Sequence, residues 1–212
     1  VLEELTQDQE LIGVLTGQWG DYGMVPRDAS FLMHATVVKH YFGGGSYPVG
    51  GSWMIPDTIV PVIRAGGGEV FTYAKVEEIV IEKGRACGVR MANGDILRAE
   101  QVVSAAGARV TYEQLLPEAL RESLGYPAKL KQVKTSGAHL CIYAGFKGTA
   151  AELGLPRTNL WIYPNEHHEA NVEAFQADVN APFPMLYVSF PSAKDPEWDS
   201  NYPGKSTVEV LT

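Results

Sequence analysis

The sequence has few cysteines and no N-glycosylation site, two features that are common in secreted proteins. It contains two cysteines in 212 residues, Cys87 and Cys141, and no Asn-x-Ser/Thr glycosylation site. Two cysteines so far apart make neither a disulfide framework, nor a redox Cys-x-x-Cys pair, nor a zinc knuckle. A reducing compartment is therefore favoured, and we expect a cytoplasmic protein.

Long apolar runs and basic clusters are also missing. No apolar stretch approaches the ~18 residues that a membrane-spanning helix needs, and no signal peptide is visible. The formal net charge is -8 without a cluster of Lys and Arg, which argues against a nucleic-acid partner. With 45% hydrophobic residues, the chain can bury a sizeable core as one domain or as two interleaved lobes.

Between Gly43 and Gly107 the residues follow a helix pattern and then a strand pattern. Ser52 follows two glycines and precedes apolar residues at helical spacing, which predicts a helix capped by its hydroxyl, with Pro61 as a kink. The glycines at 66–68 should end that helix, because glycine adopts the left-handed C-cap conformation at little cost. Residues 70–76 then favour a β-strand.

Two turn signals predict a three-stranded meander. Lys83-Gly84 separates strand candidates at 79–82 and 87–91, and in the second of these Cys87, Val89 and Met91 should share the buried face. Asn93-Gly94 is a strong two-residue turn into a third strand at 96–99.

A further short strand is expected at residues 102–103. It runs into Ser104, Ala105, Ala106 and Gly107, small residues that let a ligand or another backbone approach closely.

The flanking segments predict helices and an antiparallel sheet. Helices are expected at 2–15, at 31–42 and at 112–124, where Pro117 divides the last one. Strands are expected at 138–146, 159–163, 185–190 and 207–211. Their spacing predicts a mixed α/β fold, in which a mostly antiparallel sheet has helices on one side.

In order and spacing these elements resemble the FAD-dependent oxidoreductases that include phytoene desaturases, carotenoid isomerases and retinol saturases. The similarity lies in Tyr47-Pro48-Val49-Gly50-Gly51-Ser52, in the Gly-Gly-x-Val opening at 67–70, in Val76-x-x-Ile79, in Gly88-Val89 and in Val103-Ser104-Ala105-Ala106-Gly107. The resemblance implies a partial FAD-binding lobe at 43–110, flanked by parts of a substrate domain at 1–42 and 111–212.

The resemblance also implies where the cofactor binds. Lys75 and Val76 should contact the adenine through backbone groups, and Ser104, Ala105, Ala106 and Gly107 should approach the dinucleotide. As ordinary structure, Val76 is a core strand residue and the glycines are turn residues.

The pyrophosphate-binding Gly-x-Gly-x-x-Gly loop of such enzymes is absent, and the chain starts at Val1 without an initiator methionine. We therefore expect an internal fragment that also lacks the family's C-terminal FAD segment, so that FAD binding belongs to the full-length protein.

The substrate is expected to be apolar. The family encloses a long apolar tunnel, and Tyr47, Pro48, Gly50 and Gly51 are expected to face the flavin or that tunnel. For Tyr47 and Pro48, packing of the loop is the ordinary explanation and is favoured over a catalytic role. Aromatic residues recur before Trp53 and along the later strands, where they line either a polyene channel or a normal core. Such a substrate comes from a bilayer, so peripheral membrane contact is a further expectation.

No metal site is expected. His167 and His168 stand in Glu-His-His-Glu, which is interpreted as a solvated polar loop, and His34, His40 and His139 are assigned to core or surface roles. No catalytic triad is predicted, because a flavin supplies the hydride chemistry itself.

Three functions remain open. The first is a flavin oxidoreductase acting on carbon-carbon double bonds of an isoprenoid. The second is a flavin amine oxidase or a relative of protoporphyrinogen oxidase. The third is a non-catalytic module that binds a lipid or a partner, which the missing pyrophosphate loop favours.

Overall fold

The computed structural model describes residues 1–133 and 138–212, which form two compact units. The first unit combines Val1–Val62 with Ser136–Thr212, and the second comprises Ile63–Thr135. The chain therefore leaves the first unit and returns to it. Each unit has its own antiparallel sheet, which confirms the predicted mixed α/β class.

The first unit is built on a four-stranded sheet with the order β4-β7-β6-β5. All three pairings are antiparallel. The strands are β4 (Cys141–Lys147), β5 (Leu160–Ile162), β6 (Leu186–Ser189) and β7 (Lys205–Leu211). All four were predicted, with ends that differ by a few residues.

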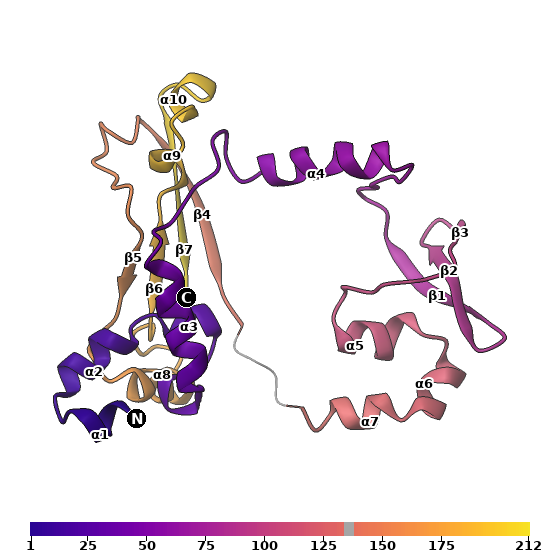
Figure 1. The fold of residues 1–212 in the computed structure, drawn as a ribbon, viewed down its shortest axis with the longest axis horizontal. Helices are drawn as coiled ribbons and strands as arrows, with labels where there is room; N and C mark the ends of the chain where they lie inside the picture. Colours follow the sequence, from indigo (N-terminus) through magenta and orange to yellow (C-terminus); the bar gives the residue numbers. More distant parts are fainter. Residues whose placement is uncertain (134–137) are drawn as a thin grey trace. The chain divides into compact units, whose positions relative to one another are not determined.

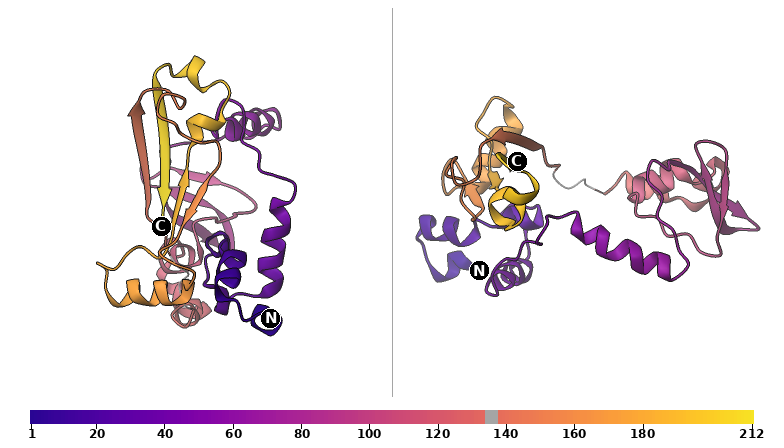
Figure 2. Two further views of the ribbon diagram at one scale, coloured as in Figure 1. Left: turned by 90° about the vertical axis from the view of Figure 1, so that its left-hand side faces the viewer. Right: turned by 90° about the horizontal axis from the view of Figure 1, so that it is seen from above.

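Helices gather near the two ends of this sheet (Figures 1 and 2). Near one end lie α2 (Gln9–Thr16) and α8 (His168–Ala177), and near the other lie α9 (Pro191–Lys194) and α10 (Trp198–Asn201). The other helices of this unit are α1 (Leu2–Leu5), the 3₁₀ turns η1 (Trp19–Tyr22) and η2 (Pro26–Asp28), and α3 (Phe31–Tyr41). Its buried apolar residues are Trp19, Met185, Phe190 and Val208.

The predicted helix at 2–15 is wrong as one element, since the chain is extended at Thr6 and a second helix starts after Asp8. The Asp8 carboxylate accepts the Leu11 amide at 3.1 Å. Such an N-cap favours a new helix start over a continuous helix.

Helix α4 (Met54–Ala65) was predicted and carries Pro61 within it. It ends in a Schellman motif, in which Gly67 has φ +80 and donates to the Arg64 carbonyl, while Gly68 donates to the Ile63 carbonyl. The left-handed residue explains why glycine stands there. The Ser52 hydroxyl makes no capping bond among the described residues; the Ser52 carbonyl instead accepts the Ile55 amide at 3.2 Å.

The second unit holds the predicted meander, β1 (Val76–Glu82), β2 (Arg85–Met91) and β3 (Ile96–Arg98). Lys83 and Gly84 have positive φ, as a tight hairpin turn requires. The second turn is the three-residue loop 92–94 rather than a two-residue turn, because the Met91 amide bonds to the Asp95 carbonyl.

Short helices complete the second unit. They are α5 (Ala108–Val110), the π-helix η3 (Thr111–Leu115), α6 (Glu118–Leu124) and α7 (Tyr126–Leu130). Pro117 divides the helical segment as predicted. The buried side chains Ile79, Val80 and Leu116 form the core where β1 meets η3.

Two predicted strands of this unit are wrong. Residues 70–75 are irregular and exposed, with Tyr73 at φ +55, and residues 101–105 are also irregular, with Val103 94% exposed. A strand needs a series of hydrogen bonds to a neighbouring strand. Among the described residues, the first segment has only the bond that the Lys75 carbonyl accepts from the Ala92 amide, and neither segment belongs to a sheet. The expected alternation in β2 is also wrong, because Gly88 is buried while Cys87, Val89 and Met91 are only half-buried.

Candidate functional site

The loop with the sequence Tyr-Pro-Val-Gly-Gly borders a cavity of about 310 Å³ in the first unit. Its lining includes Tyr47, Gly50 and Gly51, which were predicted to face substrate or flavin, but not Pro48, which is half-buried beside it. The cavity thus brings three of the four predicted loop residues together with the four-stranded sheet.

Aromatic side chains form much of the cavity wall. They come from the start of α4, from β4 and from α10, and they are Trp53, Tyr143, Trp198 and Tyr202. Trp53 and Tyr143 are 59% and 74% exposed, so a ligand in the cavity would remove apolar ring surface from water.

A lysine contacts the loop at Tyr47. The Lys194 ammonium is 5.8 Å from the centre of the Tyr47 ring, within cation-π range, and it donates to Ser189 Oγ at 2.7 Å and to Asn159 Oδ1. Burial lowers the pKa of Lys194, and the Glu209 carboxylate opposes that change.

The Tyr47 hydroxyl is held in its neutral form. Burial raises its pKa, the carboxylates of Glu209 and Asp195 act in the same direction, and a bond from the Ser52 backbone acts against them. The cavity therefore presents a neutral phenol beside the carboxylate of Glu209, which also lines it.

An aspartate that sequence reasoning missed joins the loop to α10. Asp195 is 5% exposed, and its Oδ1 accepts the Gly50 amide at 2.9 Å and the Glu197 amide at 3.0 Å. The Asp-Pro-Glu sequence signals the local contact, since Asp commonly accepts the amide two residues on. Nothing in the sequence points to the contact with Gly50.

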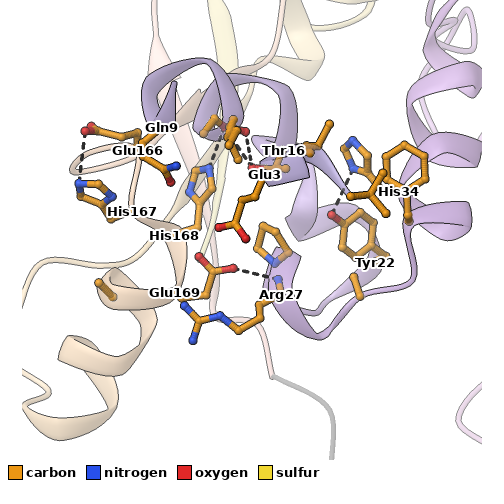
Figure 3. Close-up of a pocket in the computed structure, with 18 residues that line it drawn as sticks. Glu3, Gln9, Thr16, Tyr22, Arg27, His34, Glu166, His167, His168 and Glu169 are labelled. Carbon is orange, nitrogen blue, oxygen red and sulfur yellow. Dashed lines mark hydrogen bonds and ion pairs between the residues drawn. The ribbon is translucent and has the colours of Figure 1, made fainter. Parts of the chain in front are cut away.

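A second, larger cavity of about 510 Å³ lies near the other end of the sheet, between α2, η2, α3 and α8. Figure 3 shows polar side chains from these elements around it, including the Tyr22 hydroxyl bonded to His34 Nδ1 at 3.3 Å and the Glu169 carboxylate bonded to the Arg27 amide at 2.9 Å.

The predicted solvated loop at His167 and His168 is wrong for His168. This residue opens α8 and is 3% exposed, and its Nε2 bonds to the Gly13 carbonyl at 2.9 Å. Since a carbonyl only accepts, Nε2 carries the proton. The ring packs against Tyr163 and Trp19, so His168 is a core residue, while His167 is exposed.

The residues predicted to contact FAD all lie in the second unit. Lys75 is exposed, its carbonyl accepts the Ala92 amide at 2.9 Å, and Val76 is half-buried at the start of β1. The exposed residues Ser104, Ala105 and Ala106 lead to Gly107, which has φ +87 and opens α5.

Their backbone amides are available to a ligand. Within the described part of the chain, no hydrogen bond is donated by the amides of Ser104, Ala105, Ala106 or Gly107. The Ser104 hydroxyl bonds to that of Thr111 at 2.7 Å, and the Gly107 carbonyl accepts the Thr111 amide. Amides of this kind can donate to acceptor oxygens.

Residues 1–133 and 138–212 contain neither a metal-binding cluster nor a helix that could span a membrane. No cluster of His, Cys, Asp and Glu there could hold a metal ion. No helix there combines the length and the apolar content needed to cross a bilayer.

Comparison with known proteins places these features in a family. The model of the flavin containing amine oxidoreductases matches residues 6–186. All-trans-retinol 13,14-reductases of Danio rerio and Homo sapiens are each 36% identical over all of this chain, which covers 36% of their length. A phytoene desaturase of Cereibacter sphaeroides is 33% identical over 72% of this chain, covering 29% of that protein.

The chain thus spans little more than a third of the curated relatives that it matches throughout. The resemblance to FAD-dependent carotenoid and retinol oxidoreductases, predicted from the order and spacing of five short segments between Tyr47 and Gly107, is confirmed. Because the family model covers most of its residues, this chain belongs to the flavin containing amine oxidoreductase family.

Proposed function

We propose that this chain forms the substrate cavity of an FAD-dependent oxidoreductase that acts on carbon-carbon double bonds of an apolar isoprenoid or polyene. The observation that carries the proposal is the cavity in which the Tyr-Pro-Val-Gly-Gly loop meets four aromatic side chains. The match of retinol 13,14-reductases along the whole chain supports it.

The cavity suits a flat conjugated chain. Aromatic rings bury large apolar areas and stack against π-systems, and apolar burial contributes about 25 cal/mol per Å². The polar side chains of the lining come from several elements: Tyr47 and Ser52 at the loop, Tyr143 on β4, Trp198 and Tyr202 at α10, and Thr207 and Glu209 on β7. The match to retinol 13,14-reductases along the whole chain, rather than the lining, favours a polyene over an amine.

FAD is the proposed cofactor, held by the exposed backbone of the second unit. Its adenine is assigned to the backbone of Lys75 and Val76, and its phosphates and ribose to the amides from Ser104 to Gly107. The Lys75 carbonyl already accepts a bond from Ala92, so its contact would use the amide or the second lone pair of that oxygen.

Bound FAD would supply the hydride chemistry. The residues of this chain then orient the substrate and exclude water from it. The aromatic walls orient the bound chain, and the Tyr47 loop, which lines the cavity, shields part of it from water.

The proposed location is the cytoplasm, with peripheral contact to a membrane, because an apolar polyene partitions into bilayers. The proposed partners are the cofactor and this substrate, without nucleic acid. The -8 net charge agrees with that assignment.

The test is a titration with FAD followed by substrate trials. FAD is added to the purified protein while flavin absorbance and fluorescence are recorded, and turnover of retinol, phytoene and a panel of amines is then measured. Turnover of a polyene supports the proposal, whereas turnover of amines alone contradicts it. Binding of retinol without FAD binding or turnover would instead indicate the non-catalytic module.

A further inference from the structure

Asp195 connects two walls of the aromatic cavity through a single oxygen. Its Oδ1 accepts both the Gly50 amide of the loop and the Glu197 amide next to α10. Its own carbonyl accepts the Trp198 amide at 3.2 Å, which places a cavity-lining indole at the start of α10. One buried residue thus touches both the loop and the aromatic wall.

The bond to Gly50 matters because the other backbone bonds of this part of the loop, among the described residues, are local ones. Gly50 has φ +87 and belongs to neither a helix nor a strand, while the Gly51 amide bonds locally to the Pro48 carbonyl. A bond to a buried carboxylate is stronger than one between neutral groups. The Asp195 bond also links residues 145 positions apart in sequence.

Lys194 contacts the same loop at Tyr47. Its ammonium lies over the face of the Tyr47 ring and donates a hydrogen bond to Ser189 Oγ, and Ser189 is itself buried. The dipeptide Lys194-Asp195 therefore holds the loop at its two ends, at Tyr47 and at Gly50.

We propose that Asp195 is a positioning residue, which holds the Tyr47–Gly51 loop at a fixed distance from α10 and so sets the width of the cavity for its polyene. The effect on substrate turnover rests on the proposed function. The effect on the loop itself rests only on the contacts described above.

Three variants separate the two bonds. Asp195→Asn keeps one oxygen in place and so retains both bonds. Asp195→Ser places a shorter acceptor that serves the local Glu197 amide but does not reach Gly50. Asp195→Ala removes both. Asp199→Asn, an exposed residue of α10, is the matched control.

The structural readout is hydrogen exchange of the peptide covering residues 47–53 in the intact protein. Loss of one charge-assisted bond corresponds to roughly a 10- to 100-fold change in an opening equilibrium. We expect exchange to rise by about that factor in Asp195→Ser and Asp195→Ala, to change by less than about fivefold in Asp195→Asn, and to stay at the wild-type rate in Asp199→Asn. Unchanged exchange in a folded Asp195→Ser variant would overturn the inference. The serine variant keeps the test valid if Asp195→Ala does not fold.

Steady-state kinetics with a polyene substrate measures the effects of the variants on KM and on kcat separately. A misplaced loop weakens binding of substrate and transition state alike, so KM for the polyene should rise about tenfold in Asp195→Ser with kcat within about threefold. A residue that only supports folding would lower the active fraction and leave KM unchanged, and that result would contradict the inference. If the wild type itself turns over no polyene, the proposed function fails, while the exchange experiment still decides the role of Asp195.

Discussion

At the scale of single residues, the neighbours His167 and His168 have opposite environments. His168→Ala removes a buried ring and its bond to Gly13, and should lower the free energy of unfolding by about 2 to 4 kcal/mol. His167→Ala, at an exposed position, should change it by less than about 0.5 kcal/mol. Urea denaturation followed by tryptophan fluorescence measures both, and equal effects would contradict the core assignment.

Tyr47 offers a ring to Lys194 and a hydroxyl to the cavity. We expect the ring to matter more, because the cation-π contact and the packing survive in Tyr47→Phe. In the FAD-loaded enzyme, Tyr47→Phe should keep kcat/KM within about threefold, and Tyr47→Ala should lose about tenfold. Equal losses in the two variants would assign a role to the hydroxyl.

Tyr41 gives a pH dependence that can be observed directly. Burial raises the pKa of its hydroxyl to about 12, helped by the bond to Asp21 Oδ2 and by the charge of that carboxylate. The folded phenol therefore keeps its proton between pH 10 and about 12, where the unfolded one loses it, and the stability from this group falls as pH rises through that window.

Tyrosinate absorbance, with the titration of Tyr41→Phe subtracted from that of the wild type, isolates this transition. Asp21→Asn should move it toward lower pH, whereas Asp57→Asn, on α4, should not. A transition that stays in place in Asp21→Asn would show that the carboxylate has no part in the shift.

At the scale of elements, Gly88 controls the pairing of β2 with β3. It has φ +152, and a Cβ there would lie 2.3 Å from the Leu97 carbonyl oxygen. Gly88→Ala should therefore cost about 2 kcal/mol or more. Gly84→Asn, in the hairpin turn with open space around it, should cost only a few tenths, because asparagine tolerates the left-handed conformation. Thermal unfolding followed by far-UV circular dichroism measures the difference.

The elements that could be predicted are those with local causes. Lys83-Gly84 and Gly67 identify a turn and a helix end through their own backbone conformations, and the apolar spacing of α4 is visible in the sequence alone. The strand expected at 70–76 failed because pairing depends on a neighbour that composition does not reveal. Burial of Gly88 was missed for the same reason.

In the candidate site, too, only the features with local causes could be predicted from the sequence. Its loop could be found from the Tyr-Pro-Val-Gly-Gly segment, because that motif is contiguous. Asp195 could not, since its contact with Gly50 is set by the fold of the whole unit. The predicted FAD contacts of Lys75, Val76 and Ser104 to Gly107 remain predictions, as do the domain limits at residues 42 and 110.

At the scale of the whole molecule, the two units can be observed separately. All four tryptophans, Trp19, Trp53, Trp161 and Trp198, belong to the first unit. Tryptophan fluorescence therefore reports unfolding of that unit, while circular dichroism reports both units. We expect Gly88→Ala to lower the transition seen by circular dichroism and to leave the fluorescence midpoint within about 1 °C. A matching shift of both signals would mean that the units unfold together, as in a two-state transition.

The discontinuity of the first unit also bears on how the protein is made. The bond between His168 and Gly13 spans 155 residues. At about 5 to 20 residues per second, a ribosome adds that stretch in roughly 8 to 30 s. During that time the first helices have emerged without their partners, while the meander at 76–98 has local contacts and can form at once. The N-terminal helices therefore remain without their packing partners for longer than the strands of the meander do, and slower translation would lengthen that interval.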